Sequence, residues 1–255
     1  PAGLGESVAF SGLAQPVSVR FAANGQVFVA QKGGQVLAFD SLDDQTPDVV
    51  ADLSAETQDY WDRGMLGIAV GPDFTSTGHV YLLYTYENDD GAGPYPGGYT
   101  GTKTARLTRV TAVGDQASPS SETVIVGQQV GRSCLNFPVG ADCLASDSDG
   151  HSIGAVKVAP DGSIFLSVGD ASNGTSVDDR ALRAQSLDAL AGKILRVGPD
   201  GKGLSDNPFW NGNASANRSK VWASGLRNPF RFNLKPGTLV PYVGDVGWST
   251  WEEVN

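Results

Sequence analysis

The stretch IGAVKVAPDGSIFLSVGD, residues 153–170, contains two apolar runs separated by a Pro-Asp-Gly sequence. β-Branched and aromatic residues are frequent in both runs, and Asp161-Gly162 is a dipeptide typical of a tight turn. The stretch therefore predicts two antiparallel strands joined as a hairpin.

The same strand, turn, strand pattern occurs in three other parts of the chain. These are PVSVRFAANGQVFVAQKGGQVLAFD at 16–40, LGIAVGPDFTSTGHVYLLYTY at 66–86 and NPFRFNLKPGTLVPYVGDVG at 228–247. Repeated hairpins separated by loop insertions indicate an all-β propeller, with about four blades in this chain. A β-sandwich seldom carries such similar units, and a parallel β-helix has shorter and stricter repeats.

We find no linker between two cores and expect residues 1–255 to form a single domain. One segment, DDRALRAQSLDAL at 178–190, is compatible with either a short helix or an irregular loop. Neither alternative changes the predicted fold class.

The charge of the chain bears on its partners. The sequence has 18 Lys and Arg against 28 Asp and Glu, a formal net charge of -10. Binding to nucleic acid or to an anionic membrane needs clustered basic residues, so we expect neither partner. No apolar run is long enough to cross a bilayer.

Cys134 and Cys143 are the only two cysteines, and they lie in the loop-like segment CLNFPVGADC. A pair of cysteines without a nearby pair of histidines favours a local disulfide over a zinc site, with two free thiols as the alternative. A disulfide indicates an oxidising compartment, so we expect a secreted or periplasmic protein.

His151 lies just before the first strand of the opening stretch, and Asp170 ends the second. Because a hairpin returns the chain to its starting end, the two side chains should be neighbours. A carboxylate that accepts a hydrogen bond from one imidazole nitrogen makes the other nitrogen a better general base. The alternative is a structural histidine beside a turn aspartate.

Five motifs occur in a characteristic order. They are DRGMLGIAVGPDF at 62–74, GHSIGAVKVAPDGSIFLSVGD at 150–170, AGKILRVGPDG at 191–201, ASGLRNPFRF at 223–232 and GDVGWSTWEEVN at 244–255. In order and spacing they resemble the soluble sugar dehydrogenases that depend on pyrroloquinoline quinone (PQQ), the glucose/sorbosone dehydrogenase family. The resemblance implies a six-bladed propeller that this chain leaves incomplete at its C-terminus, so that a further segment or a second chain would close it.

The resemblance also implies catalytic roles for three residues. His151 is expected to be the general base that takes the proton of the anomeric hydroxyl, and Asp170 is expected to orient it. Arg227 is expected to face the reactive oxygen of the quinone, where its permanent charge would stabilise developing negative charge.

Further residues are implied as ligands of PQQ and of Ca²⁺. Asn228 is expected to contact the quinone beside Arg227. Gly247 and Trp248 are expected to offer backbone carbonyls to calcium, which prefers oxygen ligands, and the carboxylate of Glu253 is a further candidate.

The resemblance thus implies an oxidoreductase that converts an aldose, its small-molecule substrate, to a lactone with PQQ as hydride acceptor. The loops after Asp170 and before His151 differ from those of glucose-oxidising members, so we do not assign a particular sugar as the substrate. The alternative is a non-catalytic propeller that binds a carbohydrate or a protein through its loops. A calcium-dependent hydrolase would need more inward-facing carboxylates than the sequence places together.

Overall fold

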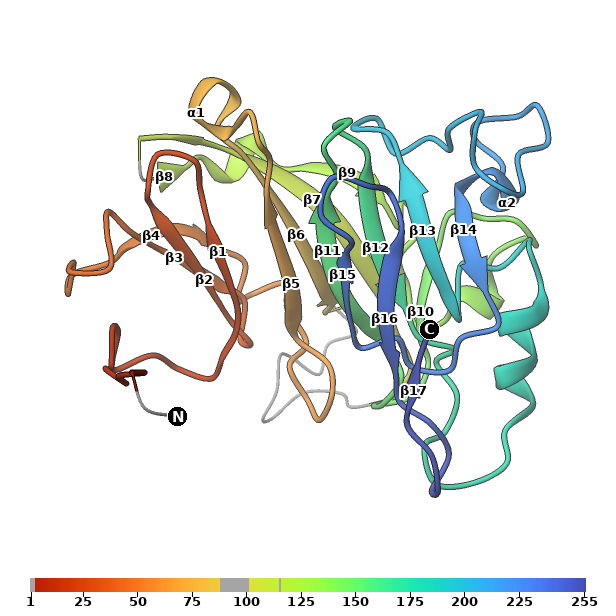
Figure 1. Ribbon diagram of the computed structural model, residues 1–255. Helices are drawn as coiled ribbons and strands as arrows, with labels where there is room; N and C mark the ends of the chain where they lie inside the picture. Colours follow the sequence, from red (N-terminus) through yellow and green to blue (C-terminus); the bar gives the residue numbers. More distant parts are fainter. Residues whose placement is uncertain (1–2, 88–100, 115) are drawn as a thin grey trace.

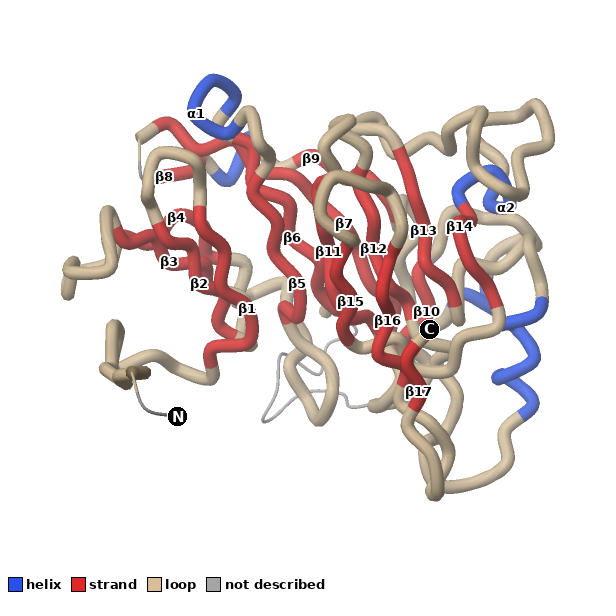
Figure 2. Tube along the Cα trace, viewed as in Figure 1, coloured by secondary structure: helices blue, strands red, loops and turns tan. Residues whose placement is uncertain are grey.

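The structure, a computed structural model, describes residues 3–87, 101–114 and 116–255 and consists mainly of antiparallel strands (Figures 1 and 2). The first sheet contains β1 (Pro16–Phe21), β2 (Val27–Gln31), β3 (Gln35–Phe39) and β4 (Asp48–Asp52), hydrogen-bonded in that order. The second has the order β10 (Leu144–Ser146), β7 (Lys103–Val113), β6 (His79–Tyr86) and β5 (Met65–Val70), and β8 (Gln116–Ala117) and β9 (Thr123–Val126) pair with β7.

The other two sheets follow in the C-terminal half of the described chain. The third contains β11 (Ile153–Val158), β12 (Ile164–Val168), β13 (Lys193–Val197) and β14 (Val221–Ser224) in sequence order. The fourth contains β15 (Arg231–Leu234), β16 (Pro241–Asp245) and β17 (Glu253–Val254).

Tight turns join the hairpins where the sequence predicts them. Gly25, Gly34, Gly162 and Gly237 follow strands β1, β2, β11 and β15, and all four have positive φ angles, between 72° and 107°. This backbone region suits glycine, which has no Cβ to clash with the backbone. These hairpin predictions are confirmed. The hairpin predicted at 66–86 also forms, but the short helix α1 (Phe74–Thr77) lies in the connection where a turn was expected.

Three hydrophobic clusters lie between successive sheets. One joins the first sheet to the second, with Phe28 and Leu82 among its members. Another joins the second to the third, and the last joins the third to the fourth around Phe165 and Phe232. Strands β1, β5, β11 and β15 contact one another in that order and form the inner strands. Sheets stacked face to face in sequence order are the blades of a propeller, so the predicted fold with four blades is confirmed.

Helical segments are short. They are α1 (Phe74–Thr77), α2 (Asn217–Lys220) and the 3-10 helices η1 (Pro119–Ser121), η2 (Cys134–Asn136) and η3 (Asp179–Gln185). The ambiguous segment at 178–190 thus begins as a 3-10 helix, capped by the Asp178 carboxylate, which accepts from the backbone N–H of Arg180. Within the described residues, no helix has the length and apolar character needed to span a membrane.

Cys134 and Cys143 form a disulfide, with their Cα atoms 5.7 Å apart. The bridge closes a loop that runs from η2 to β10, immediately before the segment that leads to His151. The predicted pairing is confirmed, and the two thiols are not free.

Candidate active site

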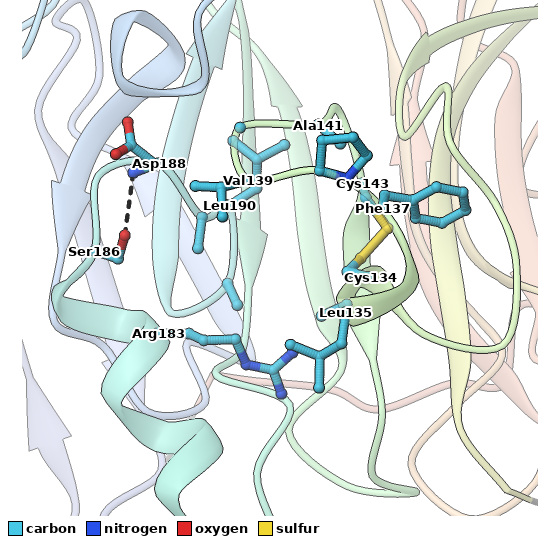
Figure 3. Close-up of a pocket in the computed structure, with 15 residues that line it drawn as sticks. Cys134, Leu135, Phe137, Val139, Ala141, Cys143, Arg183, Ser186, Asp188 and Leu190 are labelled. Atoms are coloured by element: carbon cyan, nitrogen blue, oxygen red, sulfur yellow. Dashed lines mark hydrogen bonds between the residues drawn. A yellow bond between two sulfur atoms is a disulfide. The ribbon is translucent and has the colours of Figure 1, made fainter.

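Two cavities are candidates for a functional site. The first, of about 280 Å³, lies between the disulfide loop and residues 186–191 and is shown in Figure 3. Its wall is mostly apolar, and the Ser186 hydroxyl there accepts a hydrogen bond from the backbone N–H of Asp188. Arg183, at its edge, forms an ion pair with the carboxylate of Asp147 at 2.5 Å. The charge of Arg183 is thus engaged with the protein, and the lining contains none of the site residues that the sequence predicts.

The second cavity, of about 460 Å³, lies where loops from three blades meet. Its lining comprises Asp62, His151, Gly174, Thr175, Arg227, Asn228, Val246, Gly247, Trp248 and Ser249. Five of the residues that the sequence singled out are in this lining. The propeller thus gathers residues that are far apart in sequence, from Asp62 to Ser249, around one space.

His151 and Asp170 form the polar centre of this site. The imidazole Nδ1 lies 3.0 Å from Asp170 Oδ1, and both side chains are buried. Because an ionised carboxylate only accepts, Nδ1 is the donor, and in the neutral form of the imidazole Nε2 then has the lone pair. The same Asp170 oxygen accepts from the backbone N–H of Ser172 at 2.8 Å, which fixes the carboxylate. The predicted contact is confirmed.

The backbone around the pair is strained. Non-glycine residues with positive φ in the described chain are Gln15, Trp61, His151, Ala171 and Ser249. Two of these line the cavity, and two others adjoin Asp62 and Asp170. Such conformations cost of order 1–3 kcal/mol each and concentrate at functional sites. The strained residues thus indicate the cavity around His151 as a functional site, and this argument does not depend on the family resemblance.

A close backbone approach holds His151 in this conformation. A Cβ at Gly169 would lie 2.2 Å from the backbone oxygen of His151, so only glycine fits there. The N–H of Ala171 donates to the same oxygen at 2.9 Å. On the other side, a Cβ at Gly174 would lie 3.5 Å from Nε2, which places this nitrogen at the cavity wall.

Arg227 and Asn228 enter from the start of the fourth blade. Asp245, buried on β16, accepts from the backbone N–H of Arg227 at 3.0 Å and of Asn228 at 2.6 Å. Burial raises the pKa of the Asp245 carboxyl, and these two N–H groups act in the opposite direction. The backbone oxygen of Arg227 accepts from the N–H of Asp170 at 2.8 Å, so the two predicted site residues are joined through their main chains.

The guanidinium of Arg227 is held at the cavity. Its Nη1 donates to the carbonyls of Val246 and Gly247 at 2.9 and 3.0 Å. Its central carbon lies 5.2 Å from the centre of the Trp248 ring, within the range of a cation–π contact. The structure therefore brings six of the predicted site residues together, namely His151, Asp170, Arg227, Asn228, Gly247 and Trp248.

Of the predicted calcium ligands, Gly247 and Trp248 line the cavity and Glu253 does not. The carbonyl of Gly247 already accepts from Arg227, and the indole of Trp248 faces the same guanidinium. Glu253 is exposed on β17, opposite Asp245, and lies outside the cavity lining. The described residues contain no group of three or more His, Cys, Asp or Glu side chains suited to a metal ion. Calcium also binds backbone carbonyls, so the calcium site stays a prediction.

Asp62 is a cavity residue that we did not single out from the sequence. Burial raises the pKa of its carboxyl, while Lys32 and the protonated form of His151 lower it. Its neighbour Arg63 is completely buried and donates to the backbone oxygens of Ser146 and Ser148 at 2.8 and 3.0 Å. Asp62 begins the motif at 62–74, which is the feature of the sequence that could have drawn attention to it. Only the packing of the blades shows that Asp62 lies at the cavity that contains His151.

A glucose/sorbosone dehydrogenase family profile matches residues 13–255. The chain belongs to this family. An Arabidopsis thaliana protein, HIPL2, is 29% identical and matches 84% of this chain, and an aldose sugar dehydrogenase of Escherichia coli is 25% identical and matches 77%. The PQQ-bound aldose sugar dehydrogenase of Streptomyces coelicolor has the same fold, with a TM-score of 0.68 at 20% identity over 98% of this chain.

This family member spans only part of the length of these relatives. The matches cover 34% of the Arabidopsis protein and 45% of the Escherichia coli enzyme. They cover 61% of the Streptomyces chain. We therefore treat the activity of these relatives as a proposal for this chain.

Proposed function

We propose that the protein is an oxidoreductase of the aldose dehydrogenase type, which oxidises the anomeric carbon of a sugar to a lactone with PQQ as the electron acceptor. The main support is the buried pair of His151 and Asp170, whose free Nε2 lies at the wall of a cavity that also holds Arg227. Membership of the glucose/sorbosone dehydrogenase family supports the same reaction class.

In this proposal His151 is the general base. Its Nε2 takes the proton from the hydroxyl on the anomeric carbon, and the hydride on that carbon leaves as the carbon–oxygen double bond of the lactone forms. Asp170 keeps Nδ1 protonated and stabilises the imidazolium produced by the transfer. Ser172 donates its backbone N–H to Asp170 and keeps the carboxylate aimed at the ring.

The donors of the site fit the carbonyl end of an ortho-quinone. Bound PQQ would supply a two-electron acceptor for the hydride. Arg227 would donate to the oxygen on which negative charge develops, and Asn228 would contact the quinone beside it. Because Val246 and Gly247 engage Nη1, the guanidinium is oriented before any ligand arrives.

Calcium is the second cofactor that we propose. The carbonyls of Gly247 and Trp248 and the carboxylate of Glu253 are hard oxygen donors of the kind calcium takes. Calcium takes roughly six to eight oxygens, so these three residues would supply only part of its ligands. As a Lewis acid it would make the quinone a better hydride acceptor.

The test is reconstitution of the protein with PQQ and calcium, followed by a panel of aldoses. We expect the sugar to bleach the absorbance of the quinone. The His151→Ala variant should turn over at least about 100-fold more slowly and still bind PQQ, because the base acts on the sugar. His79→Ala is the matched control, since His79 lies on β6 and outside the cavity lining.

Two results would contradict the proposal. One is equal sugar oxidation with and without the imidazole of His151. The other is failure of the folded protein to bind PQQ, which would favour a propeller that binds carbohydrate without oxidising it.

We also propose a secreted or periplasmic location. The disulfide between Cys134 and Cys143 supports it, because such bonds persist mainly in oxidising compartments. Fractionation of cells that produce the protein from its natural gene would test the location.

A further inference from the structure

Three cationic side chains from three blades lie near one another on the inner strands. Arg20 is on β1, Lys157 is on β11 and Arg231 is on β15. We call these three residues the cationic cluster. None of them lines the cavity that contains His151.

The cluster is assembled across the propeller. Arg231 Nη2 donates to the backbone oxygen of Val17 on β1 at 3.3 Å, although the two residues are 214 positions apart. Arg20 is three residues further along the same strand. Lys157 belongs to β11, which contacts β15 directly. The positive charge of Arg231 acts on both Arg20 and Lys157.

No carboxylate of the described chain forms an ion pair with any member of the cluster. By contrast, Arg180, Arg183 and Arg196 each have an aspartate partner. Other described cations, such as Arg106 and Arg109, also have no ion pair, so what distinguishes the cluster is that three such cations come together.

Many of the cluster's hydrogen-bond donors are also without protein acceptors. Arg20 Nε is buried and has no hydrogen-bond partner among the described residues. Each guanidinium has several N–H donors. Arg20 uses one of them on a backbone oxygen, and Arg231 uses two and lies over the ring of Phe230, with 4.0 Å from its central carbon to the ring centre. Lys157 also lines a cavity of about 190 Å³ at the end of β11, and Arg20 and Arg231 lie outside the lining of that cavity.

Burial and the neighbouring charges of Arg20 and Arg231 lower the pKa of Lys157 to about 8. Arg20 and Lys157 are half-buried, and Arg231 lies beside them with its side chain open to solvent. Three such cations without an anion repel one another, and a multivalent anion would remove this cost. A planar guanidinium fork matches the geometry of an oxyanion and can bind it through two parallel hydrogen bonds.

We propose that Arg20, Lys157 and Arg231 form a binding site for a multivalent inorganic oxyanion, phosphate or sulfate, between the inner strands of the first, third and fourth blades. The bound ion links three blades that are distant in sequence. It is separate from the proposed catalytic cavity and does not depend on the proposed reaction.

The test is thermal unfolding of the protein in sodium phosphate or sodium sulfate and in sodium chloride, matched in ionic strength at pH 7. An ion that binds only the folded state raises the Tm along a saturating curve. We expect this curve in phosphate or sulfate and its absence in chloride. Equilibrium dialysis with labelled phosphate measures the same site directly.

The Arg231→Gln variant should bind the ion at least about tenfold more weakly, because a hydrogen bond to a charged group is lost. Without phosphate its Tm should equal or exceed that of the natural protein, since a repulsion is removed. Arg20→Gln should behave alike. Arg218→Gln is the matched control, because Arg218 is exposed on α2, on the far side of the molecule from β1 in Figure 1.

Phosphate and sulfate also stabilise proteins generally, by exclusion from the surface. That effect does not saturate at low concentration and would be the same in all variants. Equal responses of Arg231→Gln, Arg218→Gln and the natural protein, or equal curves in chloride and phosphate, would overturn the proposal.

Discussion

His151 receives its orientation from Asp170 and its backbone conformation from the close approach of Gly169. These two constraints act on different parts of the residue. The carboxylate fixes the proton on Nδ1, and the backbone contact fixes the direction in which the ring leaves the chain. A substitution of either neighbour should therefore harm catalysis in a different way.

The first prediction concerns Asp170→Asn. The amide can turn its NH₂ toward Nδ1 and so favour the wrong tautomer, and it cannot stabilise an imidazolium by charge. We expect turnover to fall by at least about 100-fold with PQQ affinity unchanged. Steady-state kinetics and a quinone titration measure the two quantities.

Asp188→Asn is the control for this substitution, because Asp188 is exposed and lies at the other cavity. Equal turnover of Asp170→Asn and Asp188→Asn would show that Asp170 does not position the base.

The second prediction concerns removal of calcium. If Gly247, Trp248 and Glu253 contribute ligands, treatment with EDTA should abolish sugar oxidation, and calcium should restore it. Glu253→Gln should need more calcium for half-maximal activity than Glu252→Gln, because the carboxylate of Glu252 accepts from the N–H of Gly247 and is not a proposed ligand. Activity that survives EDTA in a protein free of metal would exclude the calcium site.

At the scale of elements, the site depends on how β11 and β12 meet. The N–H of Gly192, just before β13, donates to the Gly169 oxygen at 2.8 Å, and β11 begins two residues after His151. The hairpin therefore has little freedom to move its open end. A side chain at Gly169 would have to push β11 away from β12.

The third prediction follows for Gly169→Ala. Its Cβ would lie 2.2 Å from the His151 oxygen, so the strands must shift. We expect the variant to lose about 1–3 kcal/mol of unfolding free energy, as other overpacked sites do, and to lose activity as well. Denaturation in urea gives the first quantity. Gly5→Ala is the control, since a Cβ added at Gly5 would have no atom within 4 Å.

The strands and turns were accessible from the sequence because each depends on local chemistry. Apolar alternation and the dipeptide Asp161-Gly162 specify a hairpin without help from the rest of the chain. The contact of His151 with Asp170 follows from that hairpin. The place of Asp62 in the same cavity does not, because it requires the relative positions of the second and third blades.

The cationic cluster could not be predicted from the sequence either. Arg20, Lys157 and Arg231 each occur in an ordinary strand, and nothing in their local sequence shows that the three strands share the inner side of the propeller. The hydrogen bonds from Arg227 to the carbonyls of Val246 and Gly247 could not be predicted either, since they join the start of the fourth blade to the turn after β16. Long-range packing decides such contacts.

At the scale of the whole molecule, stability at alkaline pH should depend on Lys157. Its pKa in the folded protein is about 8, below the ordinary value of 10.5. Between these values the unfolded chain binds more protons than the folded chain, so stability rises as the pH increases. Lys193, buried with a pKa of about 8, contributes in the same direction.

The fourth prediction is therefore a change of slope. In chloride buffers, Lys157→Met should reduce the rise in unfolding free energy between pH 8 and pH 10.5, without abolishing it, because Lys193 remains. Urea denaturation at several pH values measures the slope. The charged neighbours Arg20 and Arg231 stay protonated throughout this range. An unchanged slope in Lys157→Met would contradict the assignment.

The loop closed by Cys134 and Cys143 has a practical consequence for handling the protein. Leu135 is 70% exposed and Val139 is 91% exposed, so proteases that cut after large apolar residues can reach the loop. A single cut there leaves the two halves covalently joined through sulfur. Such nicked material would migrate as one band on a denaturing gel without reductant and as two bands with it, so purity should be judged on reduced samples.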